Sequence, residues 1–211
     1  MFPKNFQKLI KHFADLPSIG PKQAERLVLY LFKQSREQTE DFAQDLHNFA
    51  TEVRFCKRCF HLAEEDSLCL ICRDSKRNQA KICVTEDPLD VISIEKTNSY
   101  TGLYHVLGGN LSVMSPEEIK RLKIDELLKR VKKEKTKEVI VATNPTTDGD
   151  TTALYLARIL KPLGVKVFRL GRGMPTGAIL NMLTALRFPA RWKERRRCRT
   201  LFINNFLNLI K

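Results

Sequence analysis

Four cysteines within 17 residues constrain this chain more than any other feature of its sequence. They form two C-x-x-C pairs, Cys56 with Cys59 and Cys69 with Cys72, with nine residues between the pairs. A C-x-x-C turn lets two thiolates reach one ion, and Zn²⁺ prefers four ligands in a tetrahedron. The four cysteines therefore predict a closed, structural zinc site. Metal binding would supply much of the folding energy of a module with few apolar residues.

Two other interpretations of the cysteines stay open on sequence grounds, a redox-active pair and unpaired buried thiols. The start of the chain, MFPKN, lacks the apolar segment of a secretory signal, and no run of about 18 apolar residues predicts a membrane span. We therefore expect a cytoplasmic protein, in a reducing compartment where paired cysteines favour metal over disulfides. Cys83 and Cys198 are not expected to be ligands.

Helices are predicted before the cysteines, the last of them over about 38–53. The segment LPSIGPK interrupts an amphipathic pattern, and its Pro21 suits the first turn of a new helix. Two helices joined by such a turn resemble a helix-hairpin-helix, a DNA-binding motif. We expect Gly20 to allow a positive φ and close approach of a phosphate, flanked by Lys22 and Arg26 one helical turn apart. The alternative is an ordinary helix corner with solvated basic residues.

After residue 80, short apolar strands alternate with helices, which predicts an α/β fold with a parallel sheet covered on its faces. The predicted strands are 81–85, 103–107, 138–142 and 165–170, and the predicted helices are 87–95, 116–133 and 148–160. The lysine-rich run 129–137 is typical of a solvated helix end and loop.

Acidic residues follow two of these strands: Glu86 after the first, and Asp148 and Asp150 after a later one. Ligands of parallel sheets gather beyond the carboxyl ends of the strands, so these acids are candidates to converge there and hold Mg²⁺. The pattern resembles the Toprim domain of primases, topoisomerases and some nucleases. The alternative is that the acids are helix caps and surface charges.

Two departures from the usual Toprim motifs weaken a catalytic interpretation. Toprim enzymes usually place glycine after the glutamate, where this chain has Asp87 and Pro88. Their second motif usually runs D-x-D-x-x-G, and Ala153 takes the place of that glycine here.

The order of the motifs resembles the RecR family of bacterial recombination mediators over about residues 1–177. Other segments that carry the resemblance are GLYHVLGG (102–109), ATNPT (142–146), TALY (152–155) and LKPLGV (160–165). The resemblance implies a helix-hairpin-helix region at 1–54, a four-cysteine zinc finger at 55–75 and a Toprim domain at 80–175. It also implies a ring-like tetramer that binds single-stranded, double-stranded or gapped DNA without cleaving it. The expected partners are RecO and RecF, with which the protein helps to load RecA onto single strands coated by SSB.

The resemblance also distributes roles over the residues. It gives zinc to the four cysteines, DNA contacts to Lys22 and Arg26, and engagement of RecO to Glu86, Asp148 and Asp150. It allows for Mg²⁺ at these acids without a catalytic role. The alternative function is a Mg²⁺-dependent Toprim nuclease or topoisomerase-like enzyme, and a third is a zinc-ribbon module for RNA or transcription. The net charge of +13 suggests a polyanionic partner.

The last part of the chain, residues 178–211, departs from the resemblance and carries eight basic residues and one acid. The stretch from Asn181 to Glu194 can be written in codons that, read one base earlier, encode EYADGVTLSRALEG. The family continues at this point with a sequence similar to EYADEVTLSRALEGR. We therefore hypothesise a frameshift between about Gly177 and Asn181. The basic run 195–197 would then be its by-product, and the tail is expected to leave an edge of the sheet uncovered.

Overall fold

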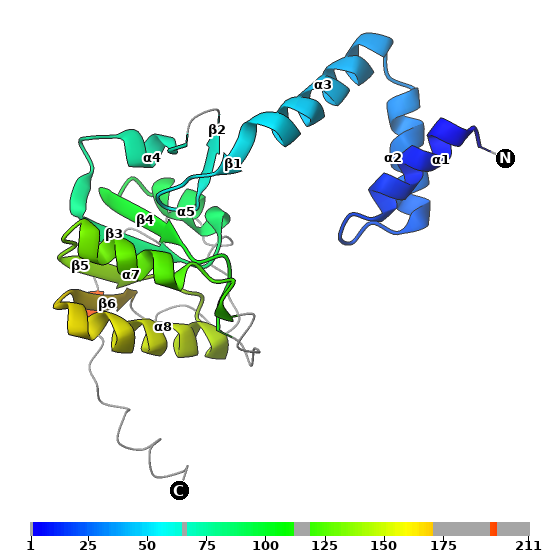
Figure 1. Cartoon of the computed structure of the whole chain (residues 1–211). Coiled ribbons are helices and arrows are strands. Elements are labelled where there is room, and N and C mark those ends of the chain that lie inside the picture. The colour runs from blue at the N-terminus through cyan, green and yellow to red at the C-terminus, as the bar shows by residue number, and fades with distance from the viewer. Residues whose placement is uncertain (1, 65–66, 112–118, 171–194, 198–211) are drawn as a thin grey trace, which may run out of the picture. The chain divides into compact units, whose positions relative to one another are not determined.

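The structure, a computed structural model, describes residues 2–64, 67–111, 119–170 and 195–197 (Figure 1). The chain divides after Val53 into an N-terminal unit of helices and a second unit that contains both the cysteine module and a sheet. The cysteine module and the sheet thus belong to one unit.

Three helices form the N-terminal unit: α1 (Lys4–Ala14), α2 (Pro21–Phe32) and α3 (Arg36–Glu52). α1 and α2 pack against each other as a hairpin. α2 buries Ala24 and Val28, whereas α1 and α3, which the structure describes in full, bury no residue. A capping box between Ser35 and Gln38 starts α3. The helices lie where the sequence predicts them, but the core of this unit is small.

The turn between α1 and α2 differs from our expectation. Gly20 is the N-cap of α2 and has an extended backbone with φ −81°, so the prediction of a positive φ there was wrong. Ser18 takes the left-handed conformation instead, with φ 65°, next to a turn closed by a bond from Ile19 N to Leu16 O. The sharp change of direction is therefore made before the glycine. Gly20 still leaves open space around its Cα.

The sheet of the second unit has the order β4-β3-β5-β6-β7. Its strands are β3 (Asn78–Thr85), β4 (Gly102–Val106), β5 (Glu138–Val141), β6 (Lys166–Leu170) and β7 (Arg195–Arg197). The first four are parallel, and in their register Cys83 lies opposite Tyr104 and Ile140. All four predicted strands are thus present and parallel, which confirms the α/β class.

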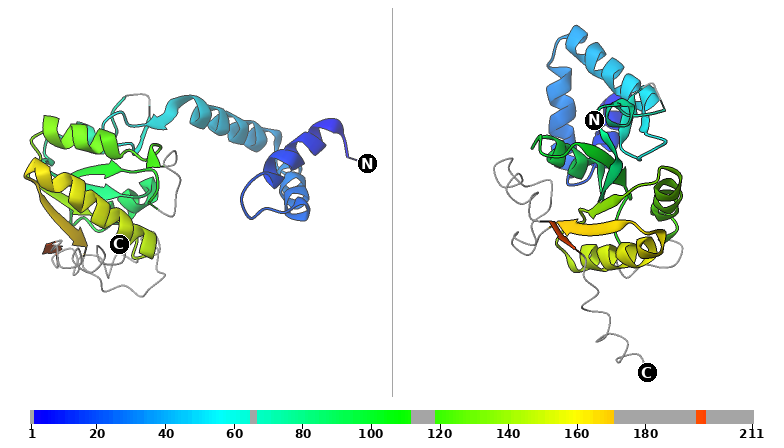
Figure 2. Two further views of the ribbon diagram at one scale, coloured as in Figure 1. Left: turned by 60° about the horizontal axis from the view of Figure 1, so that its bottom comes forward. Right: turned by 90° about the vertical axis from the view of Figure 1, so that its left-hand side faces the viewer.

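Helices cover both faces of this sheet (Figures 1 and 2). They are α5 (Pro88–Glu95), α7 (Ile124–Lys133) and α8 (Thr147–Leu160), with a short 3-10 helix η1 (Lys161–Leu163) after α8. α7 and α8 pack on one face, where Leu127 and Leu156 join Val84 and Val139 in the larger core cluster. α5 packs on the opposite face through Val91 and Ile94.

The helix predicted at 116–133 is shorter in the structure. A turn occupies residues 120–123, and α7 begins only at Ile124. The reason is tertiary, because Lys123 N donates to Leu107 O at 2.9 Å and His105 Nε2 donates to Lys123 O at 2.7 Å. The N–H and C=O groups of Lys123 are thus hydrogen-bonded to residues at the end of β4 and are not available to extend the helix. The predicted capped start at 115–118 lies outside the described residues.

The outer edge of β6 is not left uncovered, contrary to our expectation. β7 pairs antiparallel with its second half, with Phe168 opposite Arg197 and Leu170 opposite Arg195. Strand pairing therefore reaches into the segment that we attributed to a frameshift. The rest of that segment, including Cys198, lies outside the described residues.

Candidate functional site

The four predicted ligands meet in one place. A two-stranded ribbon of β1 (Val53–Phe55) and β2 (Leu62–Glu64) carries the first pair on its connecting turn, and the second pair flanks the start of α4 (Leu70–Arg73). The turn is closed by bonds from Phe60 N to Cys56 O (2.9 Å) and from Cys56 N to His61 O (2.7 Å). A bond from Lys57 N to Ser67 O (2.8 Å) joins the two halves of the module. The sequence analysis did not predict these short elements.

The sulfurs of Cys56, Cys59, Cys69 and Cys72 are buried and lie within 4.8 Å of one another. Zn–S bonds of about 2.3 Å in a tetrahedron place sulfurs roughly 3.8 Å apart, so the cluster fits this ion. The distance from Cys59 Sγ to Cys69 Sγ is 3.5 Å. In the part of the chain that the structure describes, no other group of three or more His, Cys, Asp or Glu side chains is gathered so closely.

The electrostatics of the cluster also favour a cation. Hydrogen bonds from the other three cysteines lower the pKa of Cys56, while the bond with Cys56 is the largest cause that raises the pKa of Cys59. The buried thiols therefore cannot all ionise by themselves. A divalent cation at their centre would stabilise four thiolates together, which is the chemistry of a closed structural site.

The zinc module is docked on β4, the edge strand of the sheet. Val106 N donates to Cys59 O at 2.8 Å, so a backbone group of a metal ligand completes the edge of the strand. The Phe60 ring packs edge-on against His105, with 5.4 Å between ring centroids, and Lys123 Nζ lies 5.3 Å from the Phe60 centroid. The turn that carries Cys59 and Phe60 thus packs directly against the end of β4.

Arg58, which lies between two of the ligands, provides a second attachment. Its Nε lies 2.8 Å from Glu134 Oε1, its Nη1 donates to Cys72 O at 3.3 Å and its Nη2 to Gln79 Oε1 at 2.7 Å. Arg130 Nε also donates to Glu134, at 3.1 Å. Burial acts to raise the pKa of Glu134, but Arg58 and Arg130 outweigh it and hold that pKa below its ordinary value. Arg58 therefore joins both halves of the zinc module, and the charged carboxylate of Glu134 holds Arg58 at the end of α7.

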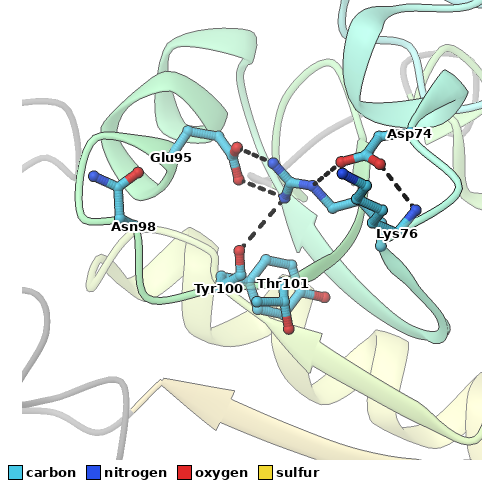
Figure 3. A pocket seen from close by; sticks show the side chains of 7 residues that line it. Asp74, Lys76, Glu95, Asn98, Tyr100 and Thr101 are labelled. Carbon is cyan, nitrogen blue, oxygen red and sulfur yellow. Dashed lines mark hydrogen bonds and ion pairs between the residues drawn. The ribbon is translucent and has the colours of Figure 1, made fainter.

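Arginines cover two outward carbonyls of β4. Arg130 Nη1 donates to Tyr104 O at 2.6 Å, and Arg77 Nη1 donates to Gly102 O at 3.3 Å. Arg77 also forms a two-point ion pair with Glu95 of α5 (Figure 3). The pair lines a cavity of about 220 Å³ whose other walls include Asp74. The charges of this cavity thus largely compensate one another.

The predicted acids lie at the carboxyl end of the sheet, but Glu86 is already engaged there. Its side chain is 6% exposed and accepts from Asn144 N (3.0 Å), Asn144 Nδ2 (2.8 Å) and Asn110 Nδ2 (3.2 Å). A Cβ at Gly149 would lie 2.1 Å from Asn144 O, so the start of α8 requires glycine for this close approach. Glu86 therefore acts as an anchor for two loops.

The two aspartates lie in the first turn of α8, which Thr146 caps by accepting from Gly149 N. Asp150 forms an ion pair with Arg169 of β6. Asp148 is partly exposed, and the structure gives its carboxylate no hydrogen bond from a described residue. The three acids therefore face the same end of the sheet without forming a set of converging metal ligands.

A fourth acid near this edge escaped the sequence analysis. Asp90 is buried at the start of α5, where it accepts from Asp87 N at 3.0 Å in a capping box. Burial raises its pKa from 3.8 to about 6. The cap interpretation that we left open for the acids thus applies to Asp87 and Asp90. The pattern D-P-L-D, with proline at the first helical position, is the signal that indicates it.

The predicted DNA contacts lie on one face of α2. Lys22 and Arg26 are four positions apart and exposed, and neither forms an ion pair with a described residue. No side chain caps the start of α2, and Gly20 leaves its surroundings open. Within the described residues, no helix is long and apolar enough to cross a membrane.

Comparison with known proteins identifies three parts of the chain. The RecR helix-hairpin-helix model matches residues 6–50, the RecR four-cysteine zinc finger model matches 53–74 and a Toprim domain model matches 80–171. The zinc-finger match and the sulfur cluster together show that the four cysteines bind structural zinc. The three matches end at residue 171 and do not test the frameshift.

Whole-chain relatives agree with these matches. Recombination protein RecR of Chloroflexus aggregans is 50% identical over 173 residues, which cover 82% of this chain and 84% of that protein. The RecR proteins of Herpetosiphon aurantiacus and Synechococcus elongatus are 47% and 44% identical, over 84% and 85% of this chain and 87% and 89% of their own lengths.

Proposed function

The chain belongs to the RecR family of recombination proteins, and from this premise we propose that it is a DNA-binding scaffold without catalytic activity. Its role lies in recombination and DNA repair. In this role it holds DNA and partner proteins together, and no covalent bond is made or broken. The observation that carries the proposal is the exposed pair Lys22 and Arg26 beside the open start of α2.

The hairpin supplies a suitable geometry for phosphate. Unpaired backbone N–H groups at a helix start attract anions, and two cations four positions apart strengthen the attraction. Such contacts bind the backbone of DNA rather than its bases, so binding would be insensitive to sequence and steeply dependent on salt. Single-stranded, double-stranded and gapped DNA all offer this backbone, and in this proposal the protein is therefore associated with the DNA of the nucleoid.

Partner proteins would bind at the carboxyl end of the sheet. In this proposal Asp148 and Asp150 face RecO, and Glu86 acts indirectly by holding the loops around them. RecF would join the same assembly, which helps to load RecA onto single strands coated by SSB. The support is the position of three acids at the edge where parallel sheets bind their ligands.

Self-association of the chain is part of the proposal. The apolar residues Phe42, Leu46 and Phe49 follow one face of α3 and are 45%, 59% and 63% exposed. A contiguous apolar face on a helix that buries no residue supports contact with another molecule. A second copy of the chain, as in a ring-like tetramer, would cover it.

The state of Glu86 supports a function without catalysis. Its carboxylate accepts three hydrogen bonds from N–H donors, so a metal ion would have to displace them. The Toprim match is the one observation that favours a Mg²⁺-dependent nuclease or topoisomerase-like enzyme. In the proposed scaffold, Mg²⁺ has no catalytic role.

Fluorescence anisotropy with gapped DNA at low salt tests the proposal. We expect the double variant Lys22→Glu, Arg26→Glu to bind at least about tenfold more weakly than the natural chain, with its helical content unchanged. The control is Lys33→Glu with Arg36→Glu, which changes charge equally at the junction of α2 and α3 and should bind normally. Unchanged affinity of the first variant, or cleavage of supercoiled DNA with Mg²⁺ that is lost in Glu86→Gln, would refute the proposal.

A further inference from the structure

A cluster of lysines lies at the end of α7 in the second unit. Lys129, Lys132 and Lys133 are spaced so that they share one side of the helix, and Lys135 and Lys137 follow in the turn that leads to β5. All five side chains are exposed. We call these five residues the α7 lysine surface.

Packing fixes this side of the helix toward solvent. Leu127 and Val131, on the opposite side of α7, are buried in the core over the sheet. The lysines therefore cannot turn inward without exposing apolar residues. Their orientation follows from the fold and not from a choice of side-chain conformers.

The acids of the same stretch do not neutralise the lysines. Glu134 interrupts the basic run in the sequence, but it points inward, is 18% exposed and pairs with Arg58 and Arg130. Glu126 is 3.5 Å from Lys123, and Glu138 is 3.5 Å from Lys81. Three of the four acids from Asp125 to Glu138 are thus paired with cations outside the α7 lysine surface, and only Asp125, four positions before Lys129, is exposed beside it.

The surface has more charge than the helix end requires. Cations near the last turn of a helix offset the partial negative charge of its carbonyls, and Lys132 and Lys133 fill that role. Lys135 and Lys137 lie beyond the helix, where this effect has fallen off. Among the described residues, none of the five lysines forms an ion pair that would explain it. A polyanion is the partner that such a surface fits.

We propose that the α7 lysine surface is a second binding site for the phosphate backbone of DNA, on a different unit from the helical hairpin. The inference rests on the proposed DNA-binding function and deepens it. Contacts from two units would raise the number of phosphates that one chain engages. The number of counterions released on binding would rise by about one per lysine engaged.

The salt dependence of DNA binding measures this contribution. The test variant is Lys129→Gln with Lys132→Gln and Lys133→Gln, since glutamine keeps the helix propensity of lysine. The control is Lys76→Gln with Lys96→Gln and Lys161→Gln, which removes equal charge from three separate elements of the same unit. We expect the slope of log K against log salt to become shallower by about 2 to 3 in the test variant, with affinity about a thousandfold lower near 50 mM salt. The control should stay within about twofold of the natural chain.

Four results would overturn the inference. In the first, the test variant keeps the natural slope and affinity. In the second, test and control variants lose affinity equally, which assigns the effect to net charge alone. In the third, the test variant loses binding to polyglutamate but not to DNA, which makes an acidic protein the partner. In the fourth, the natural chain fails to bind DNA at low salt, and only this result also refutes the proposed function.

Discussion

The guanidinium of Arg58 lies 2.8 Å from the carboxylate of Glu134, 76 positions further along the chain. Arg58 stands between two zinc ligands, and Glu134 ends the helix that covers the sheet. The contact therefore fixes the metal site relative to the Toprim domain. Together with the bond from Val106 N to Cys59 O, it makes the zinc finger a fixed part of the sheet unit.

Replacement of Arg58 by alanine tests this coupling. We expect Arg58→Ala to lower the free energy of unfolding by about 1 to 3 kcal/mol, because Glu134 loses one of its two partners and Cys72 O its donor. Zinc content should stay at one ion per chain. Urea denaturation measures the stability, and hydrogen exchange at Val106 reports on docking. The control, Lys57→Ala, removes the neighbouring exposed charge and should change neither the stability nor the exchange at Val106. A loss of stability as large as that of Arg58→Ala would contradict the role assigned to the Arg58–Glu134 contact.

Loss of one zinc ligand should have a larger effect. Cys59→Ser is expected to release zinc and to destabilise the finger, since metal binding and folding of such a module are coupled. Metal analysis after gel filtration, together with circular dichroism, checks this. Cys83→Ala removes a buried thiol that is not a ligand and should keep its zinc. A full complement of zinc in Cys59→Ser would exclude the four-thiolate site.

The pH dependence of stability should show two opposing groups. Burial lowers the pKa of His105 from 6.5 to about 4, so below pH 6.5 the unfolded chain takes up a proton that the folded chain refuses. This group lowers stability as pH falls. The raised pKa of Asp90 has the opposite sign, because the folded chain binds that proton first, between pH 6 and 3.8. The two contributions largely cancel in that window.

Asp90→Asn should remove the contribution that stabilises the folded chain as the pH falls from 6 to 3.8. Between pH 6 and 4 we expect the variant to lose about 2 to 3 kcal/mol more stability than the natural chain. Thermal denaturation across this range measures the difference, and comparing the two chains cancels the shared effect of acid on zinc binding. Parallel stability curves would show that Asp90 is ionised alike in both states.

Glu86 is expected to stabilise loops. Glu86→Gln should cost about 1 to 3 kcal/mol, because an amide has one acceptor oxygen and its NH₂ group faces the donors of Asn144 and Asn110. Hydrogen exchange should speed up at Asn144 N. Asp148→Asn, at a carboxylate without a described donor, should change stability by less than about 0.5 kcal/mol. Equal effects of the two changes would argue against the anchoring role.

The frameshift hypothesis calls for a sequencing experiment. The gene region for residues 177–181 should contain an insertion or deletion that, once corrected, restores a family-like continuation. An intact frame reproduced in independent isolates would reject the hypothesis. β7 would then be the native edge strand of this chain.

Local patterns predicted much of the fold and of the metal site. The spacing of Cys56, Cys59, Cys69 and Cys72 was sufficient because two-residue gaps bring thiolates together wherever the rest of the chain lies. Strands of the sheet were visible as apolar runs between helical patterns, since each is buried on both faces. The resemblance to a family added the order of domains.

Contacts between distant residues account for what was missed. Nothing in the run around Lys132 indicates that Glu134 turns inward to meet Arg58, so the lysines seemed ordinary. The break before α7 depends on bonds between Lys123 and the end of β4, which periodicity does not report. The positive φ fell on Ser18 because the turn closes earlier than a glycine-centred hairpin would. Tertiary bonding decided the first two cases, and a local turn bond from Ile19 N to Leu16 O decided the third.

The cover over β4 has a consequence for the behaviour of metal-free protein. Arg77, Arg130 and Cys59 together satisfy outward backbone groups of this strand. Chelation or oxidation of the thiolates would withdraw the Cys59 carbonyl and leave Val106 N unpaired at the edge of the strand, where another molecule could pair with it. Bound zinc would thus limit aggregation of the protein as well as stabilise its native fold.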